Sequence, residues 1–544
     1  MQHASPTPPE WRDICLTQWR SIPLAWRKAF FAALAVTCVV FFFDLAQFPL
    51  GDHDVGYQEG VPLLSGGRSG RWFTPFLHLL SGHVQIPVWT QLLAFACLIA
   101  ASMGAALLWW PKASAWPLFA SALVVACSPW VTDFWYYHWQ APAFTASQLF
   151  MVLALHLSLR RGRPLLRWAA ATVLSVCALA SYQSSIMTWT ACFWGFLLVR
   201  LAHWDGTRGA LGALGRRLLP SLACLATACA LYAASLALYP LLGLSLGLYQ
   251  FSTITPGGLP LRLLQLARMS WAQLVTPSGF VTPWLTALLC CVAAGGAFAL
   301  LAKGTEPRRS RIARLCLCAL GLALFPLAAE SQFLISATEA WHNFRFLALG
   351  MSYLYAFFLL ALLMDGRRGL RNLGFALFVL VLPCMAVNDL DQQVRHVRAV
   401  EHDQAVLNRI LARIEALPGF DAERRYNLVQ LGRSVPYLVE TPGTEPLRHS
   451  TISQAWNPGF ELRMLSRYLK LGDRLNEEVR VRPELMEKAL AWARGRKPFP
   501  AGGSIGIVDG DTIVLLLDPR AIGLAEARLR ELRAGGLPSA EKTE

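Results

Sequence analysis

The stretch from Ile86 to Trp110 reads IPVWTQLLAFACLIAASMGAALLWW and decides the fold, because it contains no charged residue. A helix needs about 20 mostly apolar residues to cross the hydrocarbon core of a bilayer, and this stretch is long enough. Apolar runs of similar length recur along the chain between short segments rich in arginine, proline and glycine. The pattern predicts a polytopic helical membrane protein.

The composition of the whole chain agrees with this prediction. Of its 544 residues, 55% are hydrophobic and only 15% are charged. We expect about eleven transmembrane helices, since each apolar run matches the thickness of a bilayer. They are expected at about residues 29–50, 86–110, 116–132, 142–159, 168–182, 185–201, 218–238, 284–302, 315–330, 345–364 and 373–389.

Arginine and lysine set the expected orientation, because cytoplasmic loops carry an excess of both residues. With the N-terminus in the cytoplasm, the basic segments at residues 12–28, 160–167, 200–217, 303–314 and 367–371 all fall inside. An odd number of spans then places the C-terminal region outside. The net charge of +15 is therefore an insertion signal, and nucleic acid is not expected as a partner.

Three parts of the chain follow from this topology. We expect a cytoplasmic tail over residues 1–28, a transmembrane domain over residues 29–390 and an extracytoplasmic domain over residues 391–544. The transmembrane domain includes two long outer loops, at residues 51–85 and 239–283. The first apolar run is interpreted as a retained helix, because no small-residue cleavage site follows it.

The C-terminal region has a different sequence pattern. It opens with the charged helical stretch DQQVRHVRAVEHDQAVLNRILARIEAL. The later segments RYNLVQL and SIGIVDGDTIVLLL have the composition of strands, with DGD as a hairpin turn. A small α/β domain is therefore expected.

The thirteen cysteines do not indicate a disulfide framework. Most of them lie inside apolar runs, and none lies in the long C-terminal segment. No CxxC pair with zinc-ligand spacing occurs, so a metal site is not expected either.

The first outer loop concentrates charge beside the membrane. It reads FDLAQFPLGDHDVGYQEGVPLLSGGRSGRWFTPFLHLLSGH and contains Asp52, Asp54, Glu59, Arg68 and Arg71. A carboxylate can accept the proton of an attacking hydroxyl, and cations can hold a departing phosphate. The alternatives are solvated or helix-capping carboxylates and arginines that anchor lipid headgroups. The two arginines would share one face if GGRSGRWFTPFLHLL formed an interfacial helix.

Two further outer segments carry polar residues. SPWVTDFWYYHWQAP contains Asp133 and His138 within an aromatic belt, and SYQSS places Tyr182 and Gln183 in a short turn. Aromatic belts more often anchor a protein at the membrane interface than bind a sugar. The turn residues either hydrogen-bond a sugar or satisfy the local backbone.

Charged residues near the ends of two spans need partners. Arg345, at the outer start of the tenth span, would be costly without an anion, which a lipid phosphate could supply. An internal ion pair with Asp52 or Glu330 is the alternative. Asp44, near the outer end of the first span, either faces a cavity or has reached the interface.

Four local motifs resemble one known family. They are the acidic first outer loop followed by GGRSGRWF, the segment SPWVTDFWYYHWQAPAF, the SYQSS turn and NFRFLALG at the start of a late span. Their order over about residues 29–410 is similar to that in the serotype-converting O-antigen glucosyltransferases of bacteria and their phages, of the Gtr type II-like kind. These are polytopic C-type glycosyltransferases, so the resemblance implies that fold and a bacterial inner-membrane location.

The resemblance also implies a reaction. A polyprenyl-phosphate carrier would donate glucose to a lipid-linked or polymeric glycan, with inversion and without a bound metal or other cofactor. The essential carboxylate would lie in the first outer loop, with Asp52 and Asp54 as candidates and Glu59 as the third. His53 separates the two aspartates, whereas the family often has adjacent acidic residues there, so the choice stays open.

The remaining candidate residues receive roles in donor or acceptor binding. Arg68, Arg71 and Arg345 would neutralise the donor phosphate. Tyr182, Gln183, Asp133 and His138 would bind the sugar or the acceptor. Membrane lipid is a further expected partner, and the oligomeric state stays open.

Rival functions predict different features. A related transferase could move mannose, arabinose or a modified aminosugar, and the sequence does not separate these. A flippase for a lipid-linked sugar would show inverted repeats and charges near the bilayer midplane, whereas here the polar residues gather at outer ends. A structural partner in an envelope complex would leave the DHD cluster dispensable.

Overall fold

The computed structural model describes most of the chain, and the described residues form two compact units. Of the described residues, those up to Leu390 except Gln47 belong to the first unit, and Gln47 and those from Asp391 onward belong to the second. The described residues are 20–47, 70–79, 88–135, 138, 140–160, 164–204, 207–242, 259–275, 281–303, 308–334, 349–424, 426–432 and 483–533.

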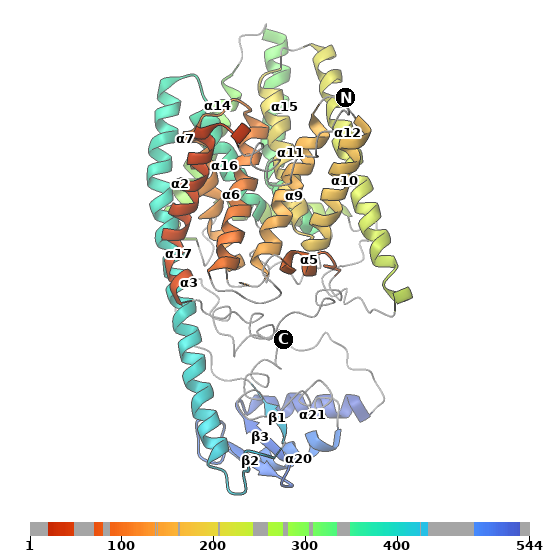
Figure 1. Cartoon of the computed structure of the whole chain (residues 1–544), viewed down its shortest axis with the longest axis vertical. Coiled ribbons are helices and arrows are strands. Elements are labelled where there is room, and N and C mark those ends of the chain that lie inside the picture. Colours follow the sequence, from red (N-terminus) through yellow and green to blue (C-terminus); the bar gives the residue numbers. More distant parts are fainter. Residues whose placement is uncertain are drawn as a thin grey trace, which may run out of the picture. The chain divides into compact units, whose positions relative to one another are not determined.

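The first unit is a bundle of helices (Figure 1). It contains α2 (Leu24–Val40), α3 (Phe42–Gln47), α5 (Thr74–His78), α6 (Trp89–Trp109), α7 (Ala115–Ala126), α8 (Pro129–Trp135), α9 (Ala141–Leu159), α10 (Pro164–Ser181), α11 (Ser185–Ala202), α12 (Arg208–Ala237), η3 (Pro240–Leu242), α13 (Leu259–Val275), α14 (Pro283–Leu301), α15 (Arg308–Ala329), η5 (Ser331–Leu334) and α16 (Leu349–Leu363). α17 (Arg368–Glu415) begins in this unit and ends in the second. α6, α10, α11 and α12 all pack on α9, and every residue of α16 is buried.

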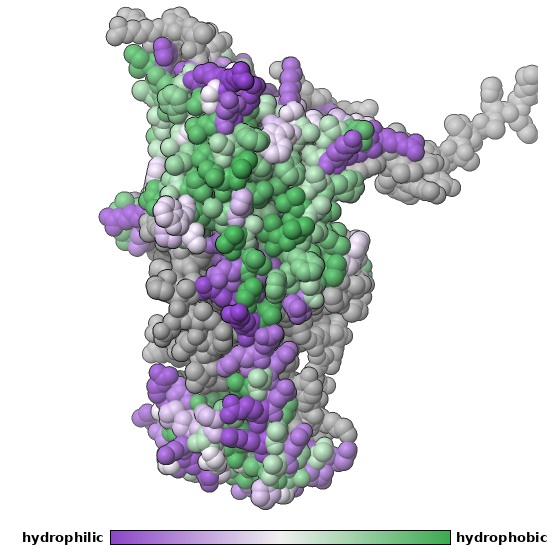
Figure 2. Space-filling model, turned by 90° about the vertical axis from the view of Figure 1, so that its left-hand side faces the viewer, coloured by the Kyte–Doolittle hydropathy of each residue, from purple (hydrophilic) through white to green (hydrophobic). Residues whose placement is uncertain are grey.

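The surface of this bundle is that of a membrane protein. Large apolar side chains are exposed on α2 and α17, among them Val39 at 75% and Val387 at 68%. On the face shown in Figure 2, hydrophobic side chains cover the middle of the bundle and hydrophilic ones gather at its end. Seven helices in the described part of the chain are long and apolar enough to cross a bilayer. The chain is therefore a polytopic, mostly helical membrane protein.

Each of the eleven predicted spans overlaps a helix. Beyond the seven long helices, α7, α10 and α16 contain shorter apolar segments, and α2 with α3 occupies the first predicted run. The number of helices that cross the membrane stays a prediction.

Two features differ from the sequence-based expectation. The predicted outer loop at residues 239–283 contains α13, whose spacing of apolar residues is helical but whose length and polarity are not those of a span. α17 is one continuous helix of 48 residues, although we expected a boundary near residue 391. The charged helical stretch after the last apolar run continues the helical turn without a breaker, which explains the continuity.

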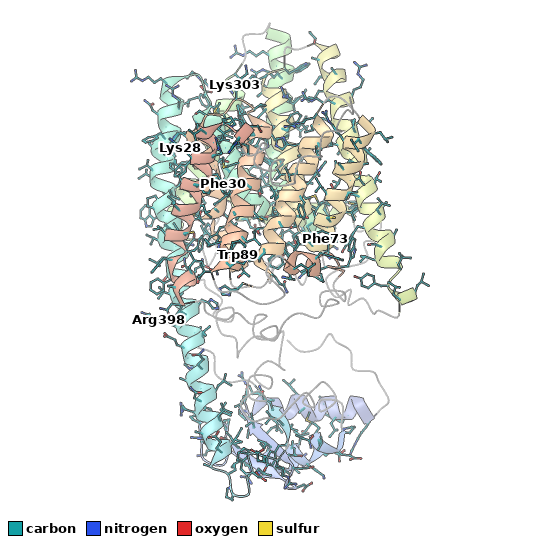
Figure 3. All side chains as sticks on the ribbon, in the orientation of Figure 1. Lys28, Phe30, Phe73, Trp89, Lys303 and Arg398 are labelled. Carbon is teal, nitrogen blue, oxygen red and sulfur yellow. The ribbon has the colours of Figure 1, made fainter. Side chains whose placement is uncertain are left out.

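The two ends of the bundle differ in chemistry. Lys28 and Lys303 mark one end, the basic end, and Phe73 and Trp89 mark the other, the aromatic end (Figure 3). At the basic end, Arg314 is buried and donates to the carbonyl oxygens of Ala202 and Leu301, at 3.5 and 3.4 Å. These carbonyls lie at the C-termini of α11 and α14, where a cation is favourable.

The second unit is a small α/β fold. Its three-stranded sheet has the order β1 (Asn427–Leu431), β3 (Thr512–Leu516), β2 (Ile505–Val508). β1 pairs with β3 in parallel, and β2 pairs with β3 antiparallel. The C-terminal part of α17 packs on one face of the sheet, and α20 (Pro483–Ala493) and α21 (Arg520–Arg533) pack on the other.

The hairpin predicted from SIGIVDGDTIVLLL is confirmed. Its turn lies between Val508 and Thr512, which pair with each other. Asp509 and Gly510 have φ angles of 53° and 73°, a left-handed conformation that glycine adopts freely and aspartate tolerates. The DGD sequence therefore sets the register of this hairpin.

Close helix contact in the bundle gives a first prediction. A β-carbon at Gly296 of α14 would lie 2.5 Å from the backbone oxygen of Phe358 in α16. Gly296→Val should lower the melting temperature of the purified chain in detergent, because overpacking costs about 1–3 kcal/mol. Gly212→Val is the matched control, since nothing lies within 4 Å of a β-carbon there. Tryptophan fluorescence would report the melting temperatures. Equal melting temperatures of the two variants would contradict the close contact.

Candidate functional site

The structure describes part of the predicted site. Arg71, Tyr182, Gln183 and His138 are described, and the backbone of Asp133 lies in α8. The predicted site residues outside the described part of the chain are Asp52, Asp54, Glu59, Arg68 and Arg345.

The segment that carries Arg71 is fixed to the aromatic end of the bundle. The amide of Phe73 donates to the carbonyl of Ala180 at 3.0 Å, and the hydroxyl of Thr74 donates to the carbonyl of Ser181 at 3.0 Å. The indole of Trp72 donates to the hydroxyl of Ser235 in α12, also at 3.0 Å. Residues 70–74 are therefore held by two helices that lie far from them in the sequence.

Gly70 permits this close approach. Its φ of 73° is left-handed, and a β-carbon there would lie 2.8 Å from the hydroxyl oxygen of Tyr232. That hydroxyl donates to the Gly70 carbonyl at 3.2 Å and accepts from the Gln183 amide at 2.7 Å. Glycine is therefore required at position 70 by both conformation and space.

The interfacial helix expected over GGRSGRWFTPFLHLL is shorter than predicted. α5 begins only at Thr74, so Arg71 precedes it. The left-handed backbone at Gly70 is incompatible with a helix running through this segment. The condition for Arg68 and Arg71 to share one face, a helix through both residues, is therefore not met at Gly70, and Arg68 itself lies outside the described residues.

Arg71 lies among polar and aromatic groups from two other motifs. Its guanidinium carbon is 5.1 Å from the ring centre of Tyr182 and 5.9 Å from that of Phe144. It donates to the amide oxygens of Gln140, at 3.3 Å, and Gln183, at 3.5 Å. Three of the motifs singled out in the sequence therefore meet at this arginine, namely GGRSGRWF, SPWVTDFWYYHWQAPAF and SYQSS.

The charge on Arg71 is balanced by dipoles alone within the described part of the chain. Both glutamine partners are neutral, and no carboxylate among the described residues forms an ion pair with Arg71. Gln140 and Ser184 occupy the positions just before α9 and α11, whose N-termini carry partial positive charge. This arrangement favours the binding of an anion. An anion would be attracted both by the guanidinium and by the partial positive charges of the two helix N-termini.

Apolar side chains border this polar group. Phe73 packs edge-to-face with Phe150 of α9, and its ring centre lies 5.6 Å from that of Phe76. Phe76 and Leu79 are 53% and 54% exposed. A ligand bound at Arg71 would therefore have apolar surface beside its charged group.

His138 lies in a second polar group, with Asp44. The Asp44 side chain is buried in the first turn of α3 and interacts electrostatically with His138. Phe41, Phe95 and Trp135 form a ring cluster in the same region. Asp44 therefore lies inside the protein instead of at an exposed interface.

A third polar group surrounds Glu330 at the end of α15. The carboxylate is buried and accepts a hydrogen bond of 2.7 Å from the hydroxyl of Ser270 in α13. Arg262, also in α13, donates to the carbonyl of Phe333 at 3.3 Å. The hydroxyl of Ser331 interacts with that of Thr190 in α11 at 2.9 Å.

Sequence reasoning missed several residues that hold Arg71. Gln140 and Phe144 lie within a quoted motif, and their positions at the start of a span were a usable signal. Tyr232 and Ser235 lie in an apolar run, where two polar side chains three residues apart on one helical face give only a weak signal.

The comparisons with known proteins identify the family. Residues 59–363, which are more than half of the chain, match the family model described as Glucosyl transferase GtrII. The match covers Arg71, Gln140, Gln183 and Tyr232, and it begins after Asp52 and Asp54. No curated protein and no solved structure matches the chain. The resemblance seen in the motifs is confirmed, and the chain belongs to the glucosyl transferase GtrII family.

Proposed function

We propose that this membrane glycosyltransferase moves glucose from a polyprenyl-phosphate carrier to a lipid-linked or polymeric surface glycan such as O-antigen. The observation that carries the proposal is Arg71, a cation without a described carboxylate partner, held where three family motifs meet. Family membership supports glucose as the sugar. The polyprenyl-phosphate carrier and the glycan acceptor go beyond what the family match shows and belong to the proposal.

Arg71 would bind the donor phosphate. The Tyr182 ring lies against the guanidinium fork, whose Nε and Nη1 donate to the glutamines, while its Nη2 donates to no described residue and remains available for phosphate oxygens. The bonds to Gln140 and Gln183 orient that fork before a ligand arrives. Such preorganised donors lower the barrier, because they stabilise the charge that develops on the leaving phosphate.

The apolar surface beside Arg71 supports a lipid-linked donor. A polyprenyl chain needs apolar contacts next to the group that holds its phosphate. Phe76 and Leu79 offer exposed apolar surface in the same short segment of chain as Arg71. A soluble nucleotide sugar would gain nothing from these side chains.

The chemical step requires a base and a leaving group. The base, Asp52 or Asp54 with Glu59 as the third candidate, would take the proton of an acceptor hydroxyl as its oxygen attacks the anomeric carbon. The bond from that carbon to the phosphate oxygen breaks, and the carrier phosphate leaves with both electrons. Arg71, together with Arg68 and Arg345, would stabilise the departing phosphate. The attack from the opposite side inverts the anomeric configuration.

The other predicted residues complete the proposed site. Tyr182 and Gln183 contact Arg71 directly. They would therefore position the arginine that binds the donor phosphate and would also bind the sugar. Asp133 and His138 are proposed for the acceptor or the sugar. The enzyme would lie in the inner membrane of a bacterium, with its N-terminus in the cytoplasm and residues 391–544 in the periplasm.

Replacing Arg71 tests the phosphate site. Arg71→Gln should lower glucose transfer about 100-fold or more, because a donor to the developing charge is lost. Arg71→Lys should be intermediate, since it keeps the charge without the planar fork. Transfer from labelled polyprenyl-phosphate glucose would be measured in membranes at equal protein level. Arg268→Gln, an exposed arginine of α13, is the control. Transfer by Arg71→Gln above half of the wild-type rate would exclude this role.

Replacing Tyr232 tests the support of the same site. Tyr232→Phe removes the hydroxyl that links Gly70 to Gln183, so the Michaelis constant for the donor should rise about three- to tenfold, in line with a loss of roughly 1 kcal/mol. The control is Tyr239→Phe, a buried tyrosine just beyond the same helix whose hydroxyl makes no hydrogen bond to a described residue. Equal donor constants for both variants would contradict the positioning role.

The two loop aspartates test the chemical step. Either Asp52→Asn or Asp54→Asn should abolish the transfer of a single hexose. An amide cannot take the proton of the acceptor hydroxyl, so the substitution that abolishes transfer identifies the base. Surface glycans from a deletion strain carrying each variant would be compared by mass spectrometry. A hexose lost on deletion and fully restored by the double variant would rule out both aspartates as the base. Unchanged glycans after deletion would favour a flippase or a scaffold instead.

A further inference from the structure

The cations of the second unit differ in whether a carboxylate pairs with them. On the helices α20 and α21 and at the adjoining turns, each of four cations has a carboxylate partner. The pairs are Lys488 with Asp509 at 2.5 Å, Arg494 with Glu526 at 2.8 Å, Arg520 with Asp518 at 3.0 Å, and Arg533 with Glu487. Hydrogen bonding to Arg520 lowers the pKa of Asp518 below its ordinary value, which shows that this carboxylate is engaged.

A set of four cations in or beside the loop of residues 496–503 has no such partners. It consists of Arg409 and Arg413 from α17, with Arg496 and Lys497 at the start of this loop, and we refer to these four residues as the basic patch. No carboxylate among the described residues forms an ion pair with any of them. Positive charge along this loop is therefore not compensated by ion pairs among the described residues.

Aromatic rings and carbonyl groups orient the arginines. The guanidinium carbons of Arg409 and Arg413 lie 5.3 and 5.0 Å from the ring centre of Phe499. Arg496 lies 4.3 Å from the ring centre of Trp492. Arg413 donates to the Ala501 carbonyl at 3.1 Å. Each arginine keeps several N–H groups that donate to no described residue. The aromatic ring beneath each guanidinium fixes the direction in which these N–H groups point.

The loop that collects these side chains is anchored to the sheet. The Phe499 amide donates to the Leu516 carbonyl of β3 at 2.8 Å, and the Leu516 amide donates to the Ser504 carbonyl at 2.9 Å. The Ser504 hydroxyl donates to the Ala501 carbonyl at 2.8 Å. The basic patch is therefore preorganised, so a ligand would bind without first ordering the loop.

The surroundings of the basic patch decide between kinds of anion. A surface that rests on a membrane combines cations with exposed apolar side chains that enter the headgroup layer. Among the described residues from Asp391 onward, Leu524 is the one large apolar side chain that is markedly exposed, and it belongs to α21. Phe499 and Trp492 are only half-exposed and lie beneath arginines. A hydrated anion fits this patch better than a lipid surface or an apolar protein interface.

We propose that the basic patch binds phosphate or carboxylate groups on the glycan that this enzyme modifies. The identification of the glycan rests on the proposed function, whereas the anion preference rests on the patch alone. Binding there would hold a long acceptor by a part that does not react and would raise the local concentration of its acceptor sugars.

A binding measurement tests the proposal without requiring transfer. The full chain in phosphatidylcholine nanodiscs would be titrated with oligogalacturonate, a carboxylate saccharide, and with neutral maltooligosaccharide of the same length. We expect binding of the charged saccharide alone, weakened at least threefold between 50 and 200 mM salt, because surface charge is screened. The variant with Arg409, Arg413, Arg496 and Lys497 all changed to Gln should bind at least about tenfold more weakly, a loss of roughly 1.4 kcal/mol.

Matched variants separate the patch from general charge and from misfolding. Changing Lys488, Arg494, Arg520 and Arg533 to Gln removes the same charge from paired positions and should alter binding less than twofold. The double variant Arg409→Gln with Lys497→Gln removes no side-chain hydrogen bond to a described residue and should still weaken binding about threefold.

Three results would overturn the proposal. The first is an equal loss of oligogalacturonate binding in the variant of the four paired cations and in the variant of the basic patch. The second is that the wild-type chain does not bind oligogalacturonate. The third is that the basic patch binds only vesicles that contain phosphatidylglycerol. Normal glucose transfer alongside any of these results would leave the proposed function standing. Patch binding in a chain that transfers no glucose would instead count against the proposed function alone.

Discussion

The cost of leaving backbone polar groups unsatisfied in hydrocarbon governs this structure. A bilayer offers no water to free N–H and C=O groups, so the apolar runs form helices whose backbones bond internally. Polar side chains inside the bundle then bond to the remaining polar atoms. The Trp109 indole donates to the Cys192 carbonyl at 2.9 Å, and the hydroxyls of Ser352 and Ser128 pair at 2.8 Å. Charge and irregular backbone are thereby confined to the ends of the bundle, where the reaction is proposed.

The same constraint explains how much the sequence predicts. Long apolar runs leave no alternative to helices, so the helices of the bundle could be located in advance, and the DGD turn located the strand hairpin. The polar partners of Arg71 could not be, because Gln140 and Gln183 bond to it from positions 69 and 112 residues away in the chain, and Tyr232 bonds to the neighbouring Gly70 from 162 residues away. Local pattern does not encode which helix ends become neighbours. α13 escaped prediction for a related reason, since a short amphipathic helix resembles a polar loop when only spans are sought.

The family match and the two compact units divide the chain in similar ways. The match ends at residue 363, within α16, so α17 and the second unit lie beyond it. The residues that hold Arg71 all lie inside the match. The second unit has a separate apolar core on each face of its sheet. The proposed phosphate site therefore lies in the part of the chain that the family model covers, whereas Asp52, Asp54 and the basic patch lie outside it.

The tie between Gly70 and Tyr232 also imposes an order on biosynthesis. These residues are 162 positions apart, so ribosomes working at roughly 5–20 residues per second need on the order of 10–30 s to extend the chain from one to the other. During that interval the segment with Arg71 has been synthesised, but the helix that will hold it has not. The hydrogen bonds that tie residues 70–72 to α12 therefore cannot form until that helix has been inserted. A nascent chain stalled before α12 would already contain Arg71 and still lack the side chains of Tyr232 and Ser235 that hold its segment in place.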